Sequence, residues 1–305
     1  MPTVAGCPAG ANCALVKDAI AKIDPYRLND HLRALTAVGS RDPRHPGHAK
    51  AVAYIKEQLE ALAYRGWKIE SQKTSYQGIP LENIFATIGS DHGGRVIVAA
   101  HYDSIANRTP GWRPATDPAP GADDNATGTA ALLEFARVIS TFDRLAWYNP
   151  ITLAFFDGEE LFHKGSAAYV QTLPKPAPIQ AVINIDMVGF NPIADRLDLL
   201  WHTSASASLR DRVIAVEKRY AIGISPLNAQ AAPDGNTIMD GTPFGLAGIP
   251  SVSICQRYGE NDATFPGNHT FHTVNDTPDK ITNPRLWLKA AMLTLAVALE
   301  LATVP

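Results

Sequence analysis

Short apolar runs recur along the chain and alternate with stretches of helical periodicity. The nearly continuous apolar runs lie at 95–100, 151–156, 181–186 and 251–255. Runs of this kind are typical of strands that are covered on both faces of a sheet. Between them, apolar side chains three and four positions apart predict helices over 52–62, 127–140 and 208–220. The alternation predicts an α/β fold with a central, mixed, mostly parallel sheet and helices on both faces.

Weaker patterns complete this arrangement and set the expected domain boundaries. They predict further strands at 67–76, 83–88 and 197–201, and further helices at 166–172 and from Pro284 onward. Because no long linker interrupts the pattern, we expect one catalytic domain over 16–305, preceded by an N-terminal segment, 1–15. The last apolar stretch contains Lys289, Thr294 and Glu300, which favours a packed helix over a membrane span.

Composition and charge narrow the classes of partner and compartment. The 305 residues carry a formal net charge of -3 and have a pI near 6.3, so neither nucleic acid nor a membrane is an expected partner. Cys7 and Cys13 lie in a Gly/Ala/Pro-rich segment and either form a disulfide or remain free thiols. A disulfide would indicate a secreted or periplasmic protein, and the cytoplasm stays open otherwise. Cys255 lies in an apolar run and is expected to be an inert core residue.

One strand ends in a way that conflicts with its own burial. The apolar run at 151–156 leads directly into Asp157, Gly158, Glu159 and Glu160. Burying a carboxylate costs several kcal/mol unless it is paired or bound to a metal. Conflicts of this kind are typical of functional sites.

Other strands end in polar residues as well. His101 and Asp103 follow the run at 95–100, and Asp186 ends the run at 181–186. Each residue alone has an ordinary explanation as a turn, cap or core residue. Active sites of open α/β sheets form at the carboxyl edge of the strands, so together these residues predict a site.

The residue types favour a zinc site. Zinc binds imidazole nitrogen and carboxylate oxygen, and two metals a few Å apart need one bridging carboxylate. His101, Asp124, Glu160 and Asp186 supply most of such a set. One further histidine is required, and the segment 268–281 offers His269 and His272.

Six short motifs lie between positions 101 and 281 and contain most of the candidate residues. They are HYDS at 101–104, GADDNATG at 121–128, FFDGEE at 155–160, NIDMVG at 184–189, MDGTPF at 239–244 and FHTVNDTPDKI at 271–281. As a set they resemble the zinc-dependent aminopeptidases of peptidase clan MH, which also includes the animal-type glutaminyl cyclases. The resemblance spans roughly Arg95 to Ile281.

The resemblance implies a ligand set for two zinc ions. His101 and Asp186 would hold one ion, Glu160 and His272 the other, and Asp124 would bridge them. Asp124 is chosen over Asp123 because it stands four residues before Gly128, where the family places its bridging carboxylate. The family also has a cis peptide after that residue.

The resemblance assigns two further roles. Asp103 would hydrogen-bond His101 and orient it. Glu159 would be the general base, taking a proton from the attacking water and passing it to the leaving amine. On this interpretation Glu160 is neutralised by metal, whereas Glu159 stays free to move protons.

The chain departs from the family pattern near the substrate. Phe271 stands where bacterial relatives often have an oxyanion-stabilising tyrosine, and Tyr258 is a candidate for that role. A Leu-Phe-His-Lys-Gly run replaces the usual Gly-containing run after Glu160, and His163 is expected in the loop or at the pocket rim. Asp240 is retained from the family's S-D-H-x-P-F element, where it would line the substrate pocket or cap a helix.

The resulting functional prediction is a two-zinc metallo-aminopeptidase that acts on peptides with a free N-terminus. The alternative is a glutaminyl cyclase with one zinc, because that branch has a similar FFDGEE motif and the same types of ligand. A non-catalytic binding domain is less favoured, since all the ligands and Glu159 are present.

Overall fold

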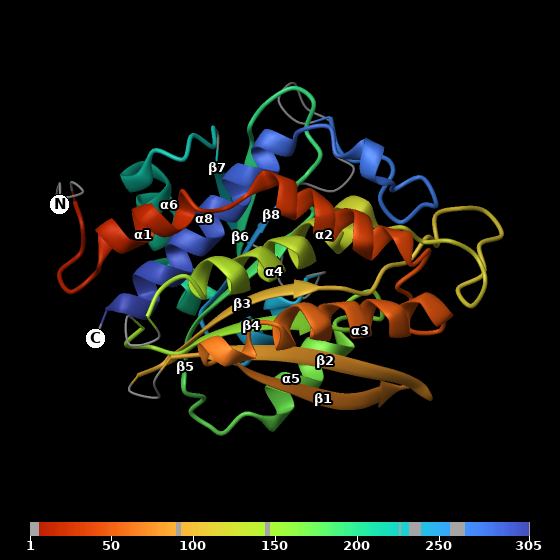
Figure 1. Cartoon of the computed structure of the whole chain (residues 1–305), viewed down its shortest axis with the longest axis horizontal. Coiled ribbons are helices and arrows are strands. Elements are labelled where there is room, and N and C mark those ends of the chain that lie inside the picture. Colours follow the sequence, from red (N-terminus) through yellow and green to blue (C-terminus); the bar gives the residue numbers. More distant parts are fainter. Residues whose placement is uncertain are drawn as a thin grey trace.

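The computed structural model describes residues 6–89, 93–143, 147–225, 227–231, 239–256 and 266–304. Its centre is a mixed sheet of eight strands in the order β1-β2-β4-β3-β5-β8-β6-β7 (Figure 1). The strands are β1 (Lys68–Tyr76), β2 (Ile79–Ile88), β3 (Arg95–His101), β4 (Ile151–Phe156), β5 (Ile179–Asp186), β6 (Leu197–Trp201), β7 (Leu227–Ala231) and β8 (Ser251–Cys255). Helices cover both faces, so the predicted fold class is confirmed.

The parallel part of the sheet is its buried centre. Strands β4, β3, β5 and β8 pair in parallel, and almost all of their side chains are buried. This is why their sequences are nearly continuous apolar runs. The antiparallel pairs lie toward the edges, where β2 pairs with β1 and β4, and β6 pairs with β8. Strand β7, which the sequence pattern did not predict, pairs with β6 in parallel.

Eight α-helices surround the sheet within the described ranges: α1 (Cys13–Ile20), α2 (Pro25–Ala37), α3 (Pro46–Glu60), α4 (Thr127–Ile139), α5 (Lys164–Thr172), α6 (Ala207–Tyr220), α7 (Gly241–Leu246) and α8 (Pro284–Thr303). Helices α4 and α8 pack on one face, with α1 and α2 against them, whereas α5 and α7 pack on the other (Figure 1).

Helices α3, α5 and α6 begin earlier than the sequence pattern predicts. Helix α3 begins at Pro46, six residues before the predicted start at 52, because the His45 side chain accepts the Gly47 amide and proline occupies the first turn. Helix α6 begins at Ala207, and the serine before it makes no capping hydrogen bond. The short α7 was not predicted.

The long apolar helix α8 is a core element. By length and mean hydropathy it could cross a membrane, but 83% of its most apolar window is buried inside the fold. Two of its charged residues have partners, since Lys289 binds Asp195 and Glu300 binds Arg219, both at 2.6 Å. The packed helix that the interrupted apolar pattern predicts is therefore confirmed.

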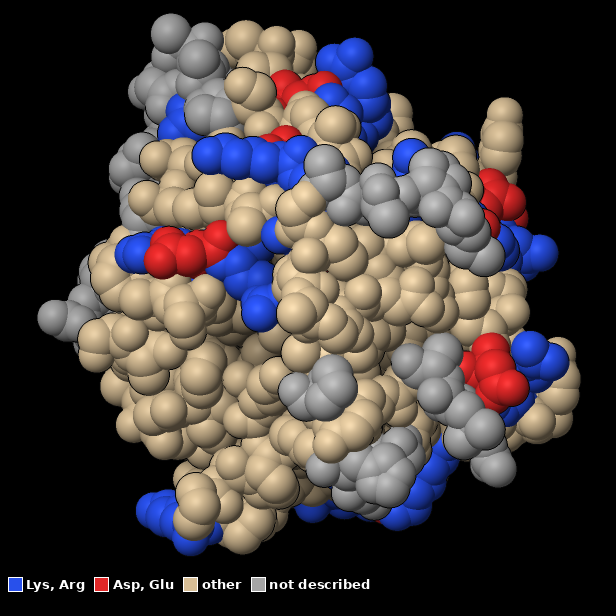
Figure 2. Space-filling model, turned by 90° about the vertical axis from the view of Figure 1, so that its left-hand side faces the viewer, with Lys and Arg blue, Asp and Glu red and all other residues tan. Residues whose placement is uncertain are grey.

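The N-terminal segment is fastened to the end of α8. A disulfide joins Cys7 to Cys13, and the Asn12 amide donates to Thr303 Oγ1. Figure 2 shows the face that carries both chain ends in Figure 1, and its charged side chains lie in small groups of both signs.

A buried arginine connects the N-terminal region to the carboxyl edge of the sheet. Arg41 is fully buried and donates to the carbonyl oxygens of Tyr102 at 2.6 Å, Pro120 at 2.5 Å and Gly121 at 2.8 Å. It thereby ties the loop after β3 to the turn Ala122–Ala126. Burial lowers the pKa of Arg41 to about 10, so the side chain remains charged at neutral pH.

We predict that Arg41→Met lowers the free energy of unfolding by about 3–5 kcal/mol, because several buried carbonyl groups lose their donor. Urea denaturation in the presence of a chelator measures this without a contribution from bound metal. Arg285→Met is the control, since Arg285 is 73% exposed in its pair with Asp195 and should change the value by about 1 kcal/mol or less. Equal losses in both variants would contradict the structural role of Arg41.

Candidate metal centre

The ends of three neighbouring strands bring the predicted polar residues together. His101 is the last residue of β3, Asp186 is the last residue of β5, and Glu159 and Glu160 lie in the turn after β4. Strands β4, β3 and β5 are adjacent and parallel, so their carboxyl ends meet at one edge of the sheet. The structure therefore brings these four residues together.

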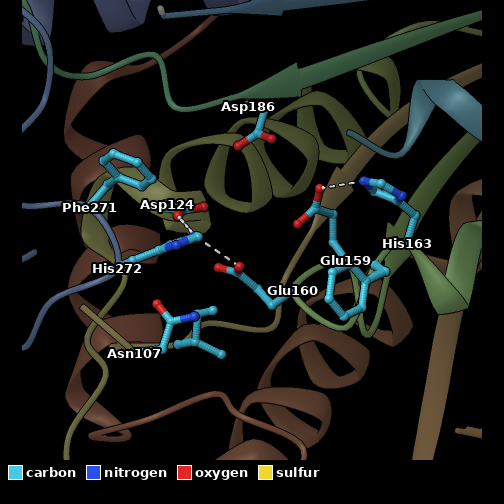
Figure 3. A pocket seen from close by; sticks show the side chains of 10 residues that line it. Asn107, Asp124, Glu159, Glu160, His163, Asp186, Phe271 and His272 are labelled. Atoms are coloured by element: carbon cyan, nitrogen blue, oxygen red, sulfur yellow. Dashed lines mark ion pairs between the residues drawn. The ribbon is translucent and has the colours of Figure 1, made fainter. Parts of the chain in front are cut away.

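Imidazole and carboxylate groups converge at this edge. His101 Nε2 lies 3.3 Å from Asp124 Oδ1 and 3.4 Å from Asp186 Oδ1. His272 Nε2 lies 3.0 Å from Asp124 Oδ2 and 2.9 Å from Glu160 Oε2 (Figure 3). Asp124 therefore lies between the two histidines, with one carboxylate oxygen facing each. Of the two histidines in the segment 268–281, His272, which the resemblance indicates, reaches the cluster, whereas His269 is exposed.

The turn Ala122–Ala126 directs Asp124 toward the site and Asp123 away from it. Asp123 accepts hydrogen bonds from the Gly189 amide at 2.8 Å and from Asn268 Nδ2 at 2.7 Å. The Asp276 carboxylate accepts the amides of both Asp123 and Asp124. The peptide bond between Asp124 and Asn125 is cis, as expected.

Asp103 fixes the backbone of the two glutamates. Its two carboxylate oxygens accept the amides of Glu159 and Glu160, each at 3.1 Å. The predicted contact with His101 is also present, but Nδ1 lies nearer to the Asp103 backbone oxygen, at 3.2 Å, than to the carboxylate, at 3.4 Å. The larger role of the Asp103 side chain is thus to hold the turn after β4.

The cluster contains more negative than positive groups. Burial, followed by the charge of Asp124, raises the pKa of Glu160 to about 7. Burial also raises the pKa of Asp186 and, to a greater extent, that of Glu159. Burial acts to lower the pKa of His272, but Glu160 and Asp124 outweigh it and raise that pKa to about 11.

The donor set fits a divalent metal. Within the described residues, His101 Nε2, Glu160 Oε1 and Asp186 Oδ1 are buried without a hydrogen-bond partner. Donor atoms of His101, Asp124 and Glu160 lie within 4.8 Å of one another. A cation at this position would supply both the missing positive charge and partners for these atoms, and mixed nitrogen and oxygen donors suit zinc.

A pocket of about 300 Å³ opens onto the cluster. It is lined by Ile105, Asn107, Asp124, Glu159, Glu160, Phe162, His163, Asp186, Phe271 and His272. In Figure 3, Glu159 and His163 lie on one side and Phe271 and His272 on the other. His163 Nε2 lies 3.5 Å from Glu159 Oε1.

The remaining predicted pocket residues have different outcomes. Phe271 lines the pocket. Asp240 is fully buried and is not among the lining residues, and although it precedes α7 its side chain makes no capping hydrogen bond. Burial raises the pKa of Asp240 to about 7. Tyr258 lies outside the described residues.

The family model of Peptidase family M28 matches residues 83–297, which include every residue of this cluster of histidines and carboxylates. The chain belongs to peptidase family M28. It is therefore a member of a hydrolase family of peptidases. The resemblance found in the six motifs is confirmed.

Relatives and solved structures agree with this membership. Leucine aminopeptidase 1 of Pyrenophora teres f. teres is 27% identical over 290 residues, which are 92% of this chain and 71% of the relative. The LapA aminopeptidase of Legionella pneumophila has a similar fold, with a TM-score of 0.79 at 20% identity, covering 99% of this chain and 78% of that one. Porphyromonas gingivalis glutaminyl cyclase has a TM-score of 0.72 at 22% identity, covering 91% and 98%.

Residues outside the six motifs support the site, and the sequence pattern did not predict them. Arg41 and His48 both precede the matched range, and neither is among the site residues predicted from the sequence. His48 Nε2 lies 3.0 Å from Asp157 Oδ2, which also accepts the Glu82 amide at 2.8 Å. The Asp157 amide donates to Asn83 Oδ1 at 3.0 Å. These contacts fix Asp157, which begins the turn that contains Glu159 and Glu160, and no local motif indicates them.

The His48–Asp157 pair predicts a specific pH dependence of stability. Burial acts to lower the pKa of His48, but its hydrogen bond to Asp157 and the negative charges of Asp157, Asp103 and Asp42 together outweigh burial and raise that pKa above its ordinary value of 6.5. The stability that the charged imidazole contributes is therefore fully present below about pH 6.5 and is lost as pH rises through the folded-state pKa. Burial raises the pKa of Asp157 as well, which acts in the same direction.

We predict that His48→Gln, whose amide can still donate to Asp157, loses less stability than the wild type between pH 6 and pH 9. Urea denaturation at several pH values measures the two free energies of unfolding. His269→Gln is the control, because this exposed imidazole has no part in the pair. Parallel pH profiles for the wild type and His48→Gln would show that the pair does not titrate on unfolding.

Proposed function

We propose that the chain is a zinc-dependent aminopeptidase that removes N-terminal residues from peptides. The observation that carries this proposal is the different placement of two adjacent glutamates. Glu160 contacts His272 inside the ligand cluster, whereas Glu159 is 8% exposed, lines the pocket and has His163 as its nearest ion-pair partner. One carboxylate is thus available to hold metal and the other to move protons.

The contacts around Asp124 support a set of ligand roles. His101 and Asp186 would hold one zinc ion, Glu160 and His272 would hold the second, and Asp124 would bridge them. When bound, zinc supplies Lewis-acid polarisation of the scissile carbonyl and makes water a stronger nucleophile at neutral pH. Asp103 positions the turn by holding the amides of Glu159 and Glu160.

Glu159 has the properties of a general base. Burial raises its pKa well above the ordinary value for glutamate, and a base with a raised pKa holds a proton more readily during turnover. It would accept the proton of the attacking water and pass it to the leaving amine. The pocket carboxylates would also attract the α-ammonium group of the substrate, which favours cleavage at a free N-terminus.

The compartment is a second part of the proposal. Disulfides persist in oxidising environments, and Cys7 and Cys13 are joined. We therefore propose a secreted or periplasmic protein.

The test compares two reactions of the purified protein. The proposal predicts release of p-nitroaniline from leucine-p-nitroanilide, loss of that activity with chelator and its return with zinc. Conversion of an N-terminal glutaminyl peptide to pyroglutamate without release of amino acids would instead support the glutaminyl cyclase alternative. No turnover in either assay would favour a non-catalytic binding domain.

Glu159→Gln separates proton transfer from metal binding. We predict a loss of kcat of at least 100-fold with zinc content equal to that of the wild type, measured by atomic absorption. Asn107→Gln is the matched control, because it changes a pocket-lining side chain that the proposed mechanism does not use for proton transfer. A Glu159→Gln variant with near-normal kcat would remove Glu159 from the mechanism, and loss of zinc would make it a ligand.

A further inference from the structure

The turn that contains Glu159 and Glu160 continues into two consecutive residues with a left-handed backbone conformation. Phe162 has φ 66° and His163 has φ 56°, a region that residues other than glycine rarely occupy. The His163 amide donates to the Glu159 carbonyl at 2.8 Å, and the Lys164 amide donates to the Gly158 carbonyl at 2.9 Å. These bonds close the turn tightly, so the backbone requires positive φ values whichever side chains stand there.

Phe162 gains little from the fold in return. Its side chain is 75% exposed, so it buries little apolar surface in the free protein. Glycine would adopt the same backbone without the steric penalty that a Cβ atom brings. Strain of this type is typical of functional sites, and Phe162 also lines the pocket.

The position of the turn indicates which part of a substrate meets Phe162. Glu159 and Phe162 belong to the same turn, and His163 from that turn approaches the Glu159 carboxylate. If Glu159 protonates the leaving amine, the leaving side of the peptide must lie against this turn. The second residue of the substrate is the first side chain on that side.

We propose that Phe162 is a specificity-determining residue that binds an apolar side chain at the second position of the substrate. The inference rests on the aminopeptidase function proposed above. Packing of an exposed aromatic ring against an apolar side chain removes both from water and explains why a strained, exposed phenylalanine lies beside the base. It extends recognition beyond the N-terminal residue to the residue that follows it.

The test uses leucyl-phenylalanine amide and leucyl-glycine amide, which share the N-terminal residue and differ only in the second. We expect the wild type to favour the phenylalanine substrate in kcat/KM. In Phe162→Gly this preference should fall about three- to tenfold, whereas Phe162→Tyr, which keeps the ring, should retain it. The Tm of Phe162→Gly should be equal to or higher than that of the wild type, because the backbone strain is relieved.

Ala221→Gly is the matched control. Ala221 has φ 49° at the end of α6, is exposed and does not line the pocket. It should change Tm in the same direction and leave the substrate preference unchanged. An unchanged substrate preference in Phe162→Gly, or a Tm several degrees lower, would overturn the inference about Phe162 and leave the aminopeptidase proposal standing. Cleavage of neither dipeptide amide by the wild type would overturn the aminopeptidase proposal as well.

Discussion

Burial of several carboxylates at one edge of a parallel sheet is the constraint on which the rest of the structure depends. Two histidines face Asp124, Glu160 and Asp186, and this leaves an excess of buried negative charge. A protein interior tolerates such charges only when cations or hydrogen-bond donors compensate them. A bound divalent metal would satisfy this requirement.

The surrounding chain supports the cluster mainly through backbone groups. Arg41 binds carbonyl groups of the segments on either side of the loop after β3. Carboxylates of Asp103 and Asp276 bind amides next to the ligands. These hydrogen bonds fix the backbone from which each candidate ligand side chain extends. The donor atoms of those side chains take no part in these bonds and can therefore face a metal.

The sequence predicted what depends on local pattern and missed what depends on long-range packing. Apolar runs predicted the central strands, because strands buried on both faces must be apolar throughout. The positions of His101, Glu160 and Asp186 at or just after strand ends predicted that these residues lie close together, since parallel strands share a carboxyl edge. Arg41 binds backbone carbonyl groups far along the chain. Because every residue type has such a carbonyl group, the sequence pattern does not indicate these partners. Strand β7 lies at the edge of the sheet, where pairing depends on its neighbour more than on its own pattern.

In the proposed site Glu160 holds metal and Glu159 moves protons, and the location of bound zinc tests this difference most directly. Crystals of the zinc-loaded protein, measured on both sides of the zinc absorption edge, give anomalous peaks that locate the ions without reference to activity. We predict two peaks, one between His101 and Asp186 and one between Glu160 and His272, with Asp124 at both and Glu159 at neither. A peak coordinated by Glu159, or none at the cluster, would contradict the account.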